Sequence, residues 1–426
     1  MKNNYFYLFL YIKLNNLKFF YIIYIFINFI IHTTLKEQSM QKSKIIKLSI
    51  TIIFSILTIA LLILNSNHLV SHASYEHTIN AGSSVLIERT SGKVLADQNS
   101  HARLPIASVT KLMTILIALE EIDNGHISLS DQVTVSSNAS GMGGSQIFLD
   151  ANQKYELSEL LKSVIIASAN DSSVAIAEYI SGSENNFVKL MNEKAISLGM
   201  HDTNYVNCTG LPSIDGYSSA YDQAILLNNV LNYPTYREYS SIWLEDFVHP
   251  SGRITQMTNT NKLSRFYDGC IGGKTGSTNQ AKYCLAVGAK RADMELISVV
   301  LGADNSKDRF KLASDMLNYG FDNFTTTTIF SNNNLINKTI EIKGQNRSTT
   351  LIAERNYSIV NEKNTTPNFS LNYNLPTSLR KVTKGDIVGN VEIVIDGIVV
   401  DTINILSAES HKESSIWDNF KEIVKN

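Results

Sequence analysis

Leu104-Pro105-Ile106-Ala107-Ser108-Val109-Thr110-Lys111-Leu112-Met113-Thr114 is the stretch on which the interpretation of this chain depends. An apolar pattern runs from it to Gly125, which predicts a buried helix that begins near Ser108 and ends at that glycine. Ser108 and Lys111 are three residues apart, so they share one face of the helix. Backbone N–H groups at a helix N-terminus are unpaired, and the helix dipole favours negative charge there. Ser108 is therefore a candidate nucleophile whose own N–H helps to hold an oxyanion.

The Ser-x-x-Lys pattern is a weak signal when it stands alone, because it occurs by chance about once or more in a chain of this length. An N-capping serine followed by a surface lysine is the simpler explanation. A catalytic interpretation needs support from other parts of the chain.

The composition indicates a globular protein of two domains. The 426 residues exceed one typical domain, and 44% of them are hydrophobic and 18% charged. The net charge of −2, without a basic run that contains aromatics, predicts no nucleic-acid partner. Three cysteines are too few for a disulfide framework, and the sequence contains neither a CxxC nor an HExxH motif. The sequence therefore predicts no metal site.

Residues 40–73 are typical of a secretory signal peptide. Three lysines follow Met40, an apolar run extends from about position 48 to 64, and Ser71-His72-Ala73 supplies the small residues of a cleavage site after Ala73. The alternative is an uncleaved membrane helix, because the run is only slightly shorter than a full span. Either interpretation predicts that the rest of the protein is exported.

Residues 1–39 form a second hydrophobic block ahead of the signal. Their narrow composition of Phe, Tyr, Ile, Leu, Asn and Lys leads to the hypothesis that Met40 is the true start. Residues 1–39 would then be a spurious upstream extension.

Residues 76–324 contain helical and strand patterns in a mixed order. A strand hairpin with a glycine turn is predicted over 84–96. After the Ser108 helix, further helices are predicted over 155–167, 172–180, 186–198, 221–231 and 307–321. Three successive antiparallel strands are predicted over 270–278, 282–288 and 294–301. This pattern predicts an α/β (α+β) domain in which helices flank an antiparallel sheet.

Two further polar motifs follow the Ser108 stretch. Ser168-Ala169-Asn170 interrupts two predicted helices, where polar residues usually act as caps. Lys274-Thr275-Gly276 lies in the first of the late strands, where neighbouring glycines suggest close approach of a ligand backbone. A chance Lys-Thr-Gly is expected in only about one such chain in ten, so its position after the other two motifs is a strong signal.

In this order the three motifs resemble those of penicillin-binding proteins and serine β-lactamases. More closely, residues from about 81 to 409 resemble the low-molecular-weight D-alanyl-D-alanine carboxypeptidases of bacterial peptidoglycan metabolism. The resemblance implies a β-lactamase/transpeptidase-like catalytic domain over 76–324. One departure lies at Asn207-Cys208-Thr209-Gly210-Leu211 and at Tyr217, where the family often carries a histidine. We expect these positions to lie outside the nucleophile machinery and to affect substrate detail more than activity.

The resemblance also implies a role for each motif residue. Ser108 would be the acylated nucleophile, and Lys111 the general base, with a pKa well below its usual value of about 10.4. Ser168 would relay a proton to the leaving nitrogen, while the backbone N–H groups of Ser108 and Ser277 would form the oxyanion hole. The implied substrate-binding residues are Asn170, Lys274, Thr275, Gly276, Ser277, Thr278 and Arg309. An exposed position on a helix face explains Arg309 about equally well.

The implied reaction removes the terminal D-alanine from a peptidoglycan stem pentapeptide through an acyl-enzyme, without any cofactor. β-Lactams would acylate the same serine as covalent inhibitors. Three alternatives remain open at this point: a β-lactamase, a peptidoglycan D,D-endopeptidase, and a penicillin-binding sensor without turnover. No signature of a deacylating glutamate is found, which argues against the first of them.

Residues 325–409 show short alternating runs rich in Thr, Ile, Val and Asn, which predict a small all-β domain that serves as a spacer or docking module. Residues 410–426 follow as an amphipathic tail, in which five apolar residues form one helical stripe: Ile416, Trp417, Phe420, Ile423 and Val424. This stripe is typical of a helix that lies in a membrane interface, and equally of a short helix docked on its own protein.

Overall fold

The computed structural model describes residues 80–331, 334–343, 347–365 and 367–413. The upstream extension, the signal peptide and most of the amphipathic tail lie outside these residues. Within the described part of the chain, no helix combines the length and the hydropathy that a bilayer span requires.

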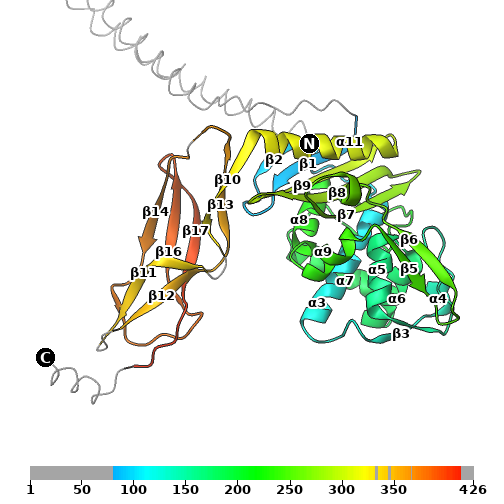
Figure 1. The fold of residues 1–426 in the computed structure, drawn as a ribbon, viewed down its shortest axis with the longest axis horizontal. Helices are drawn as coiled ribbons and strands as arrows, with labels where there is room; N and C mark the ends of the chain where they lie inside the picture. Colours follow the sequence, from blue (N-terminus) through cyan, green and yellow to red (C-terminus); the bar gives the residue numbers. More distant parts are fainter. Residues whose placement is uncertain (1–79, 332–333, 344–346, 366, 414–426) are drawn as a thin grey trace, which may run out of the picture. The chain divides into compact units, whose positions relative to one another are not determined.

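A five-stranded antiparallel sheet organises the first part of the described chain (Figure 1). Its strands lie in the order β2-β1-β9-β8-β7, so β7 is an edge strand. The strands are β1 (Ser83–Glu88), β2 (Val94–Gln98), β7 (Cys270–Thr278), β8 (Lys282–Arg291) and β9 (Met294–Ala303). The predicted hairpin and the three predicted late strands are therefore confirmed, with Gly92 at a φ of +70° in the hairpin turn.

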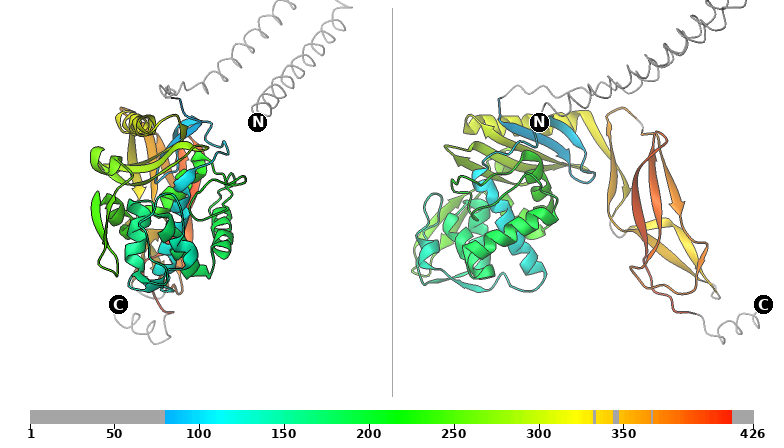
Figure 2. Two further views of the ribbon diagram at one scale, coloured as in Figure 1. Left: turned by 90° about the vertical axis from the view of Figure 1, so that its right-hand side faces the viewer. Right: turned by 180° about the vertical axis from the view of Figure 1, so that it is seen from behind.

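Helices cover both faces of this sheet (Figures 1 and 2). Helix α11 (Ser306–Asn323) packs on one face, where its apolar residues meet Leu86, Leu285 and Leu296. The other face packs on the larger helical layer through Val85, Ala286 and their neighbours. That layer comprises α3 (Lys111–Asp123), α4 (Ser137–Ser140), α5 (Leu157–Ile166), α6 (Asn170–Ser181), α7 (Glu184–Ser197), α8 (Ala220–Val230), α9 (Pro234–Ser241) and α10 (Leu263–Phe266).

The helix predicted to begin near Ser108 starts as a different structure. Residues Ala107–Thr110 form a single 3₁₀ turn, η1, and the α-helix proper begins at Lys111. The other predicted helices are confirmed with boundary shifts of a few residues. The chain departs from helix between α5 and α6 because Ser168 has a φ of +62°.

Two short ribbons complete this part of the chain. Strand β3 (Gln132–Thr134) pairs with β4 (Lys154–Glu156), and β5 (Leu244–Val248) pairs with β6 (Ile254–Thr258). Neither ribbon was expected from the sequence.

The C-terminal part of the described chain is all β. Strand β10 (Phe324–Phe330) pairs with β13 (Tyr357–Glu362). A six-stranded sheet is formed by β14 (Phe369–Asn374), β16 (Ile387–Ile395), β17 (Ile398–Ser407), β12 (Ser348–Ala353), β11 (Leu335–Ile342) and β15 (Ser378–Leu379), in that spatial order. A separate core of Ile, Val and Leu side chains supports it. The predicted fold class, a helix-flanked antiparallel sheet followed by an all-β domain, is confirmed.

Candidate active site

Ser108 and Lys111 lie at the junction of η1 and α3. Lys111 Nζ is 2.9 Å from Ser108 Oγ and donates a 2.7 Å hydrogen bond to the carbonyl of Thr209. The lysine is fully buried, whereas Ser108 is partly exposed. A surface lysine behind an N-capping serine is therefore excluded, because the amine reaches the hydroxyl from inside the protein.

Burial sets the protonation of Lys111. Desolvation disfavours its charged form and lowers its pKa to about 7, although Cys208 and Asp171 act in the opposite direction. A lysine with this pKa is largely neutral just above pH 7, so it has a lone pair available for the proton of Ser108. The low pKa that the family resemblance implies for this residue is present.

Strand β7 approaches Ser108 directly. A Cβ atom on Gly276 would lie 2.5 Å from the carbonyl oxygen of Ile106 and 2.9 Å from the backbone nitrogen of Ser108. Only glycine permits this contact, which brings the edge of the sheet beside the N–H of Ser108. Ala107, next to Ser108, has a φ of +48°, a conformation that costs an L-residue free energy.

A hydrogen bond between Lys274 and Ser168 connects the third motif to the second. Lys274 Nζ donates hydrogen bonds of 2.7 Å to Ser168 Oγ and 3.1 Å to the carbonyl of Thr275. Desolvation lowers the pKa of Lys274 well below its usual value, and the positive charges of Lys111 and Arg309 lower it further. The site thus holds two buried amines, each in contact with a serine hydroxyl.

Asn170 is held through one end of its side-chain amide. Its Nδ2 donates a 2.6 Å hydrogen bond to the carbonyl of Gly143, whereas its Oδ1 is buried and has no partner in the described part of the chain. A buried acceptor without a partner is costly, so this oxygen is suited to receive an N–H from a bound ligand. The sequence left open whether the glycine-rich loop 140–145 is a cleft rim or a plain connector. Its Gly143 carbonyl bonds to Asn170, so the loop contacts this site.

The remaining strand residues lie at the open end of β7. Ser277 is exposed and Thr275 lies two positions earlier on the same face, while the Thr278 hydroxyl accepts a 2.9 Å hydrogen bond from the Ala281 N–H. Arg309 is buried rather than exposed on its helix, and its Nη1 donates to the carbonyls of Gly276 at 2.9 Å and Cys284 at 3.3 Å. Arg309 thus fixes the strand from behind.

A shallow opening lies beside η1, with a cavity volume of about 30 Å³. Its lining includes Ala107, Gly210, Tyr217 and Thr278. It borders the segment that carries Ser108 and the end of β7. Tyr217, one of the positions that departs from the family pattern, faces this space.

The segment 207–211, which the sequence analysis expects to lie outside the nucleophile machinery, contacts Lys111 through its backbone. The Thr209 carbonyl is a direct partner of Lys111 Nζ. The interaction uses a backbone oxygen, which any residue type supplies, so the side chain at position 209 gives no sign of it.

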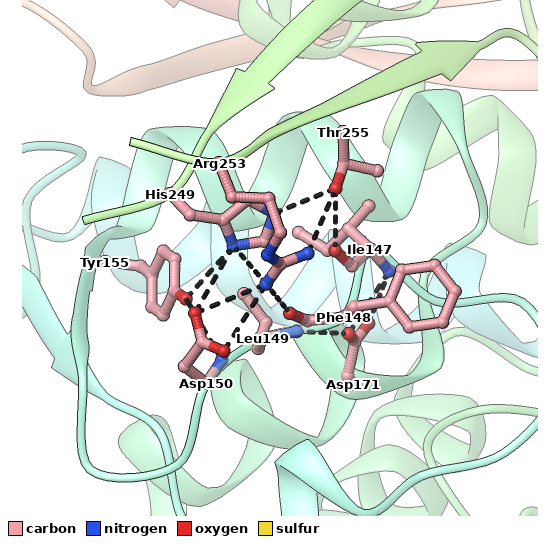
Figure 3. A network of polar contacts seen from close by, with 9 residues as sticks. All are labelled: Ile147, Phe148, Leu149, Asp150, Tyr155, Asp171, His249, Arg253 and Thr255. Atoms are coloured by element: carbon pink, nitrogen blue, oxygen red, sulfur yellow. Dashed lines mark hydrogen bonds and ion pairs between the residues drawn. The ribbon is translucent and has the colours of Figure 1, made fainter. Parts of the chain in front are cut away.

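A polar network, partly buried, supports the loop that contacts Asn170 (Figure 3). Asp171 accepts hydrogen bonds from the backbone N–H groups of Ile147 and Leu149, at 3.2 and 3.1 Å. From the β5–β6 ribbon, Thr255 Oγ1 donates to the carbonyl of Ile147 at 3.2 Å, and Arg253 Nη2 donates to that of Phe148 at 2.5 Å. The loop is therefore held from both sides, by α6 and by a ribbon that the sequence analysis missed.

Within the described residues, no group of three or more His, Cys, Asp or Glu side chains is arranged to hold a metal ion.

Comparison with known sequences identifies the family of this chain. The sequence profile of D-alanyl-D-alanine carboxypeptidases matches residues 68–305, which include all three motifs. This chain belongs to the D-alanyl-D-alanine carboxypeptidase family. The profile of the penicillin-binding protein 5 C-terminal domain matches residues 324–413. The predicted low-molecular-weight penicillin-binding carboxypeptidase, a serine-type peptidase, is confirmed at the level of the family.

Individual carboxypeptidases of this family align over most of their length. The chain is 38% identical over 356 residues to D-alanyl-D-alanine carboxypeptidase DacF of Bacillus subtilis, an alignment that covers 80% of this chain and 91% of the relative. It is 30% identical over 354 residues to DacC of Escherichia coli, covering 80% and 88%. Penicillin-binding protein 5 of Haemophilus influenzae superposes with a TM-score of 0.67 at 30% identity, covering 80% of this chain and all of that one.

Proposed function

We propose that this carboxypeptidase releases the terminal D-alanine from peptidoglycan stem peptides, with Ser108 as nucleophile and Lys111 as general base. The contact between the buried Lys111 amine and the Ser108 hydroxyl carries the proposal. A lysine with a pKa of about 7 accepts a proton near neutral pH, which an ordinary lysine does not.

Acylation is the first step. Ser108 Oγ attacks the carbonyl carbon of the penultimate D-alanine while its proton moves to Lys111 Nζ. The oxyanion is held by the backbone N–H groups of Ser108 and Ser277, beside the close approach of Gly276. When the C–N bond breaks, Ser168 gives its hydroxyl proton to the leaving nitrogen and takes up the proton held by Lys111, so the amine is neutral again and free D-alanine departs.

Deacylation is the second step. A water molecule attacks the ester, its proton moves to the general base, and the Ser108 hydroxyl is restored with release of the shortened peptide. A β-lactam forms the same ester with Ser108. Opening of its ring leaves the amine attached to the acyl group, so no fragment departs to make room for water.

The substrate is held by groups on both sides of the serine. Asn170 Oδ1, which has no partner in the described chain, accepts the N–H of a substrate amide. The terminal carboxylate binds at the end of β7, through Thr275, Ser277 and Thr278 and under the positive potential of Lys274. Arg309 contributes to that potential and supports Gly276 from the far side of the strand.

The domain organisation is proposed as the sequence predicts it. Residues 76–324 are the catalytic domain and 325–409 a β domain that acts as a spacer or docking module. Residues 40–73 are the export signal and 1–39 an upstream extension. The family acts on the bacterial cell wall, and export to the extracytoplasmic face of the membrane is consistent with that substrate.

The tail, residues 410–426, is proposed to hold the enzyme at the membrane surface. The backbone N–H and carbonyl of His411 pair with Val382, so a truncation should begin after this bridge. Deleting residues 414–426 should shift the exported protein from the membrane fraction to the soluble one. An unchanged distribution would instead favour a helix docked on its own protein.

The activity is tested by D-alanine release from a pentapeptide that ends in D-Ala-D-Ala. Wild-type protein should release D-alanine, and Ser108→Ala should neither release it nor be labelled by a fluorescent penicillin. Labelling of Ser108 without release would point to the sensor alternative. Release from a crosslinked dimer, but not from the pentapeptide, would favour an endopeptidase.

A β-lactamase is not favoured as an alternative. The match of residues 324–413 to a penicillin-binding protein C-terminal domain supports the carboxypeptidase assignment. The test is the lifetime of the penicilloyl-enzyme, which should greatly exceed the time of one peptide turnover.

A further inference from the structure

We propose that the Asn207 side chain positions Lys111, because it folds residues 207–211 into the turn that presents the Thr209 carbonyl to the lysine amine. The inference rests on the role proposed above for Lys111, and it assigns a positioning function to a residue that does not touch Ser108 or the amine.

The turn is organised around a single oxygen atom. Asn207 Oδ1 accepts hydrogen bonds from the backbone N–H groups of Thr209 at 3.1 Å and Gly210 at 2.6 Å, and from the Thr209 hydroxyl at 3.1 Å. Its Nδ2 donates to the Leu211 carbonyl at 3.0 Å. An asparagine that bonds to the backbone two and three residues ahead fixes a local turn in this way. All four bonds depend on one side-chain amide.

Two neighbouring helices hold the same segment from outside. Thr114 Oγ1, one turn after Lys111 on α3, donates a 2.8 Å hydrogen bond to the Cys208 carbonyl. Glu184, the first residue of α7, accepts a 3.1 Å hydrogen bond from the Cys208 N–H. Cys208 and Thr209 are both buried. The peptide groups on both sides of Cys208 are thus fixed, which leaves the Thr209 carbonyl directed at Lys111.

The turn also packs directly on the nucleophile's own segment. Gly210 has a φ of +79°, and a Cβ atom at this position would lie 1.9 Å from the carbonyl oxygen of Ala107. No larger residue fits between the turn and η1. A displacement of the turn would therefore be transmitted to Ser108 as well as to Lys111.

The Thr209 carbonyl determines how the amine can act. A neutral lysine has two N–H donors and one lone pair, and it must turn the lone pair toward the Ser108 hydroxyl in order to accept its proton. The 2.7 Å bond to Thr209 occupies one N–H and limits rotation of the amine. Without this acceptor the lone pair has no fixed direction, and a misplacement of about 1 Å can cost a rate factor of about 100.

The test compares Asn207→Ala and Asn207→Asp in the full chain. The readout is the second-order rate of Ser108 labelling by a fluorescent penicillin, measured as a function of pH. N207A removes the oxygen that organises the turn, so its rate should fall about 10- to 100-fold at every pH. N207D keeps an acceptor oxygen but adds a negative charge near Lys111, which raises the pKa of that lysine. Its rate should therefore approach the wild-type rate at high pH, while its acidic limb moves up by about one pH unit.

Asn192→Ala is the matched control. Asn192 clamps the same segment two residues upstream, through Nδ2 to the Tyr205 carbonyl at 2.8 Å and Oδ1 to the Tyr205 N–H at 2.8 Å. Like Asn207 it is partly buried, but it makes no bond to residues 207–211. N192A should lose stability and keep both its labelling rate per folded molecule and its pH profile.

The outcomes separate the possible roles of Asn207. Wild-type rates in N207A, or equal rate losses in N207A and N192A, would overturn the proposal in favour of no role or a purely structural one. A rise in KM for the peptide, with an unshifted acidic limb in N207D, would instead mean that Asn207 contacts substrate. Lys111→Ala run in parallel tests the underlying assignment, because normal labelling of K111A would refute Lys111 as base whatever Asn207 does.

Discussion

Lys274 Nζ donates a 2.7 Å hydrogen bond to Ser168 Oγ, which lies 106 positions earlier in the chain. This contact joins an edge strand to the turn between two helices, so the sheet and the helical layer meet at the site. Both residues are buried, and neither motif would be complete without the other.

Replacing Lys274 with alanine should therefore disable the proton relay as well as remove positive charge. The rate of labelling by a fluorescent penicillin should fall by about 100-fold or more, the range for loss of a positioned proton-transfer group. Lys282→Ala is a suitable control, since Lys282 forms an exposed ion pair with Asp304 at 2.7 Å. A K274A protein that is labelled at the wild-type rate would contradict the relay.

The pH dependence of acylation should follow Lys111. Its pKa is lowered to about 7, and only the neutral amine accepts the Ser108 proton. The rate should therefore increase as the pH rises through about 7 and level off above it. Stopped-flow labelling across this range measures the limb directly. If the rate instead rises only near the ordinary pKa of lysine, the amine is hydrated in solution.

Lys111 should also make the free energy of unfolding depend on pH. Its pKa is about 7 in the folded protein but near 10.5 in the unfolded chain, so between these values the unfolded state binds more protons. The free energy of unfolding should then increase with pH, by up to about 1.4 kcal/mol per pH unit for this group. Lys111→Met lacks the group and should lose that slope in urea titrations at pH 7, 8 and 9. Identical slopes in the two proteins would rule out the buried, neutral amine.

Asp171→Asn should weaken the loop that contacts Asn170 and shift the pH profile. The carboxylate accepts backbone hydrogen bonds from Ile147 and Leu149, and an amide cannot replace it without turning a donor toward one of them. A stability loss of about 1–3 kcal/mol is expected. Because the negative charge of Asp171 raises the pKa of Lys111, its removal should move the acidic limb of acylation to lower pH.

Asp150→Asn provides the comparison for that variant. Asp150 belongs to the same network (Figure 3), but its side chain is 46% exposed and its ion pair with Arg253 is 3.3 Å long. Exposed pairs contribute little, so D150N should change stability by less than about 1 kcal/mol. A larger loss in D150N than in D171N would reverse the assignment of the main anchor.

The sequence was sufficient to predict those features that depend on residue type and order. The three motifs, the late strands and the helix after Ser108 could be predicted because serine, lysine, glycine and apolar periodicity carry their own signals. The contact of the Thr209 carbonyl with Lys111 could not be predicted, because every residue type has the same backbone oxygen. The β5–β6 ribbon was missed for a related reason: its anchors, Arg253 and Thr255, bond to a loop about 100 residues away.

For Arg309, the sequence could not decide between an exposed and a buried position. Its spacing on α11 is compatible with an exposed or a buried position, and only the packing of α11 on the sheet decides between them. The structure buries it against Gly276, where its charge also lowers the pKa of Lys274.

The pairing of β1 with β9 has a consequence for how the enzyme folds. Ser83 is paired with Leu301, so the first strand of the sheet has its central neighbour only when almost the whole catalytic domain has been synthesised. Contacts so distant in sequence make folding slow and late, because a long loop must close before they contribute. A chain that threads through a translocation channel must remain unfolded until its passage is complete. Residues 80–293 cannot complete this sheet before β9 joins them, and this delay would help to keep the chain unfolded for the export proposed above.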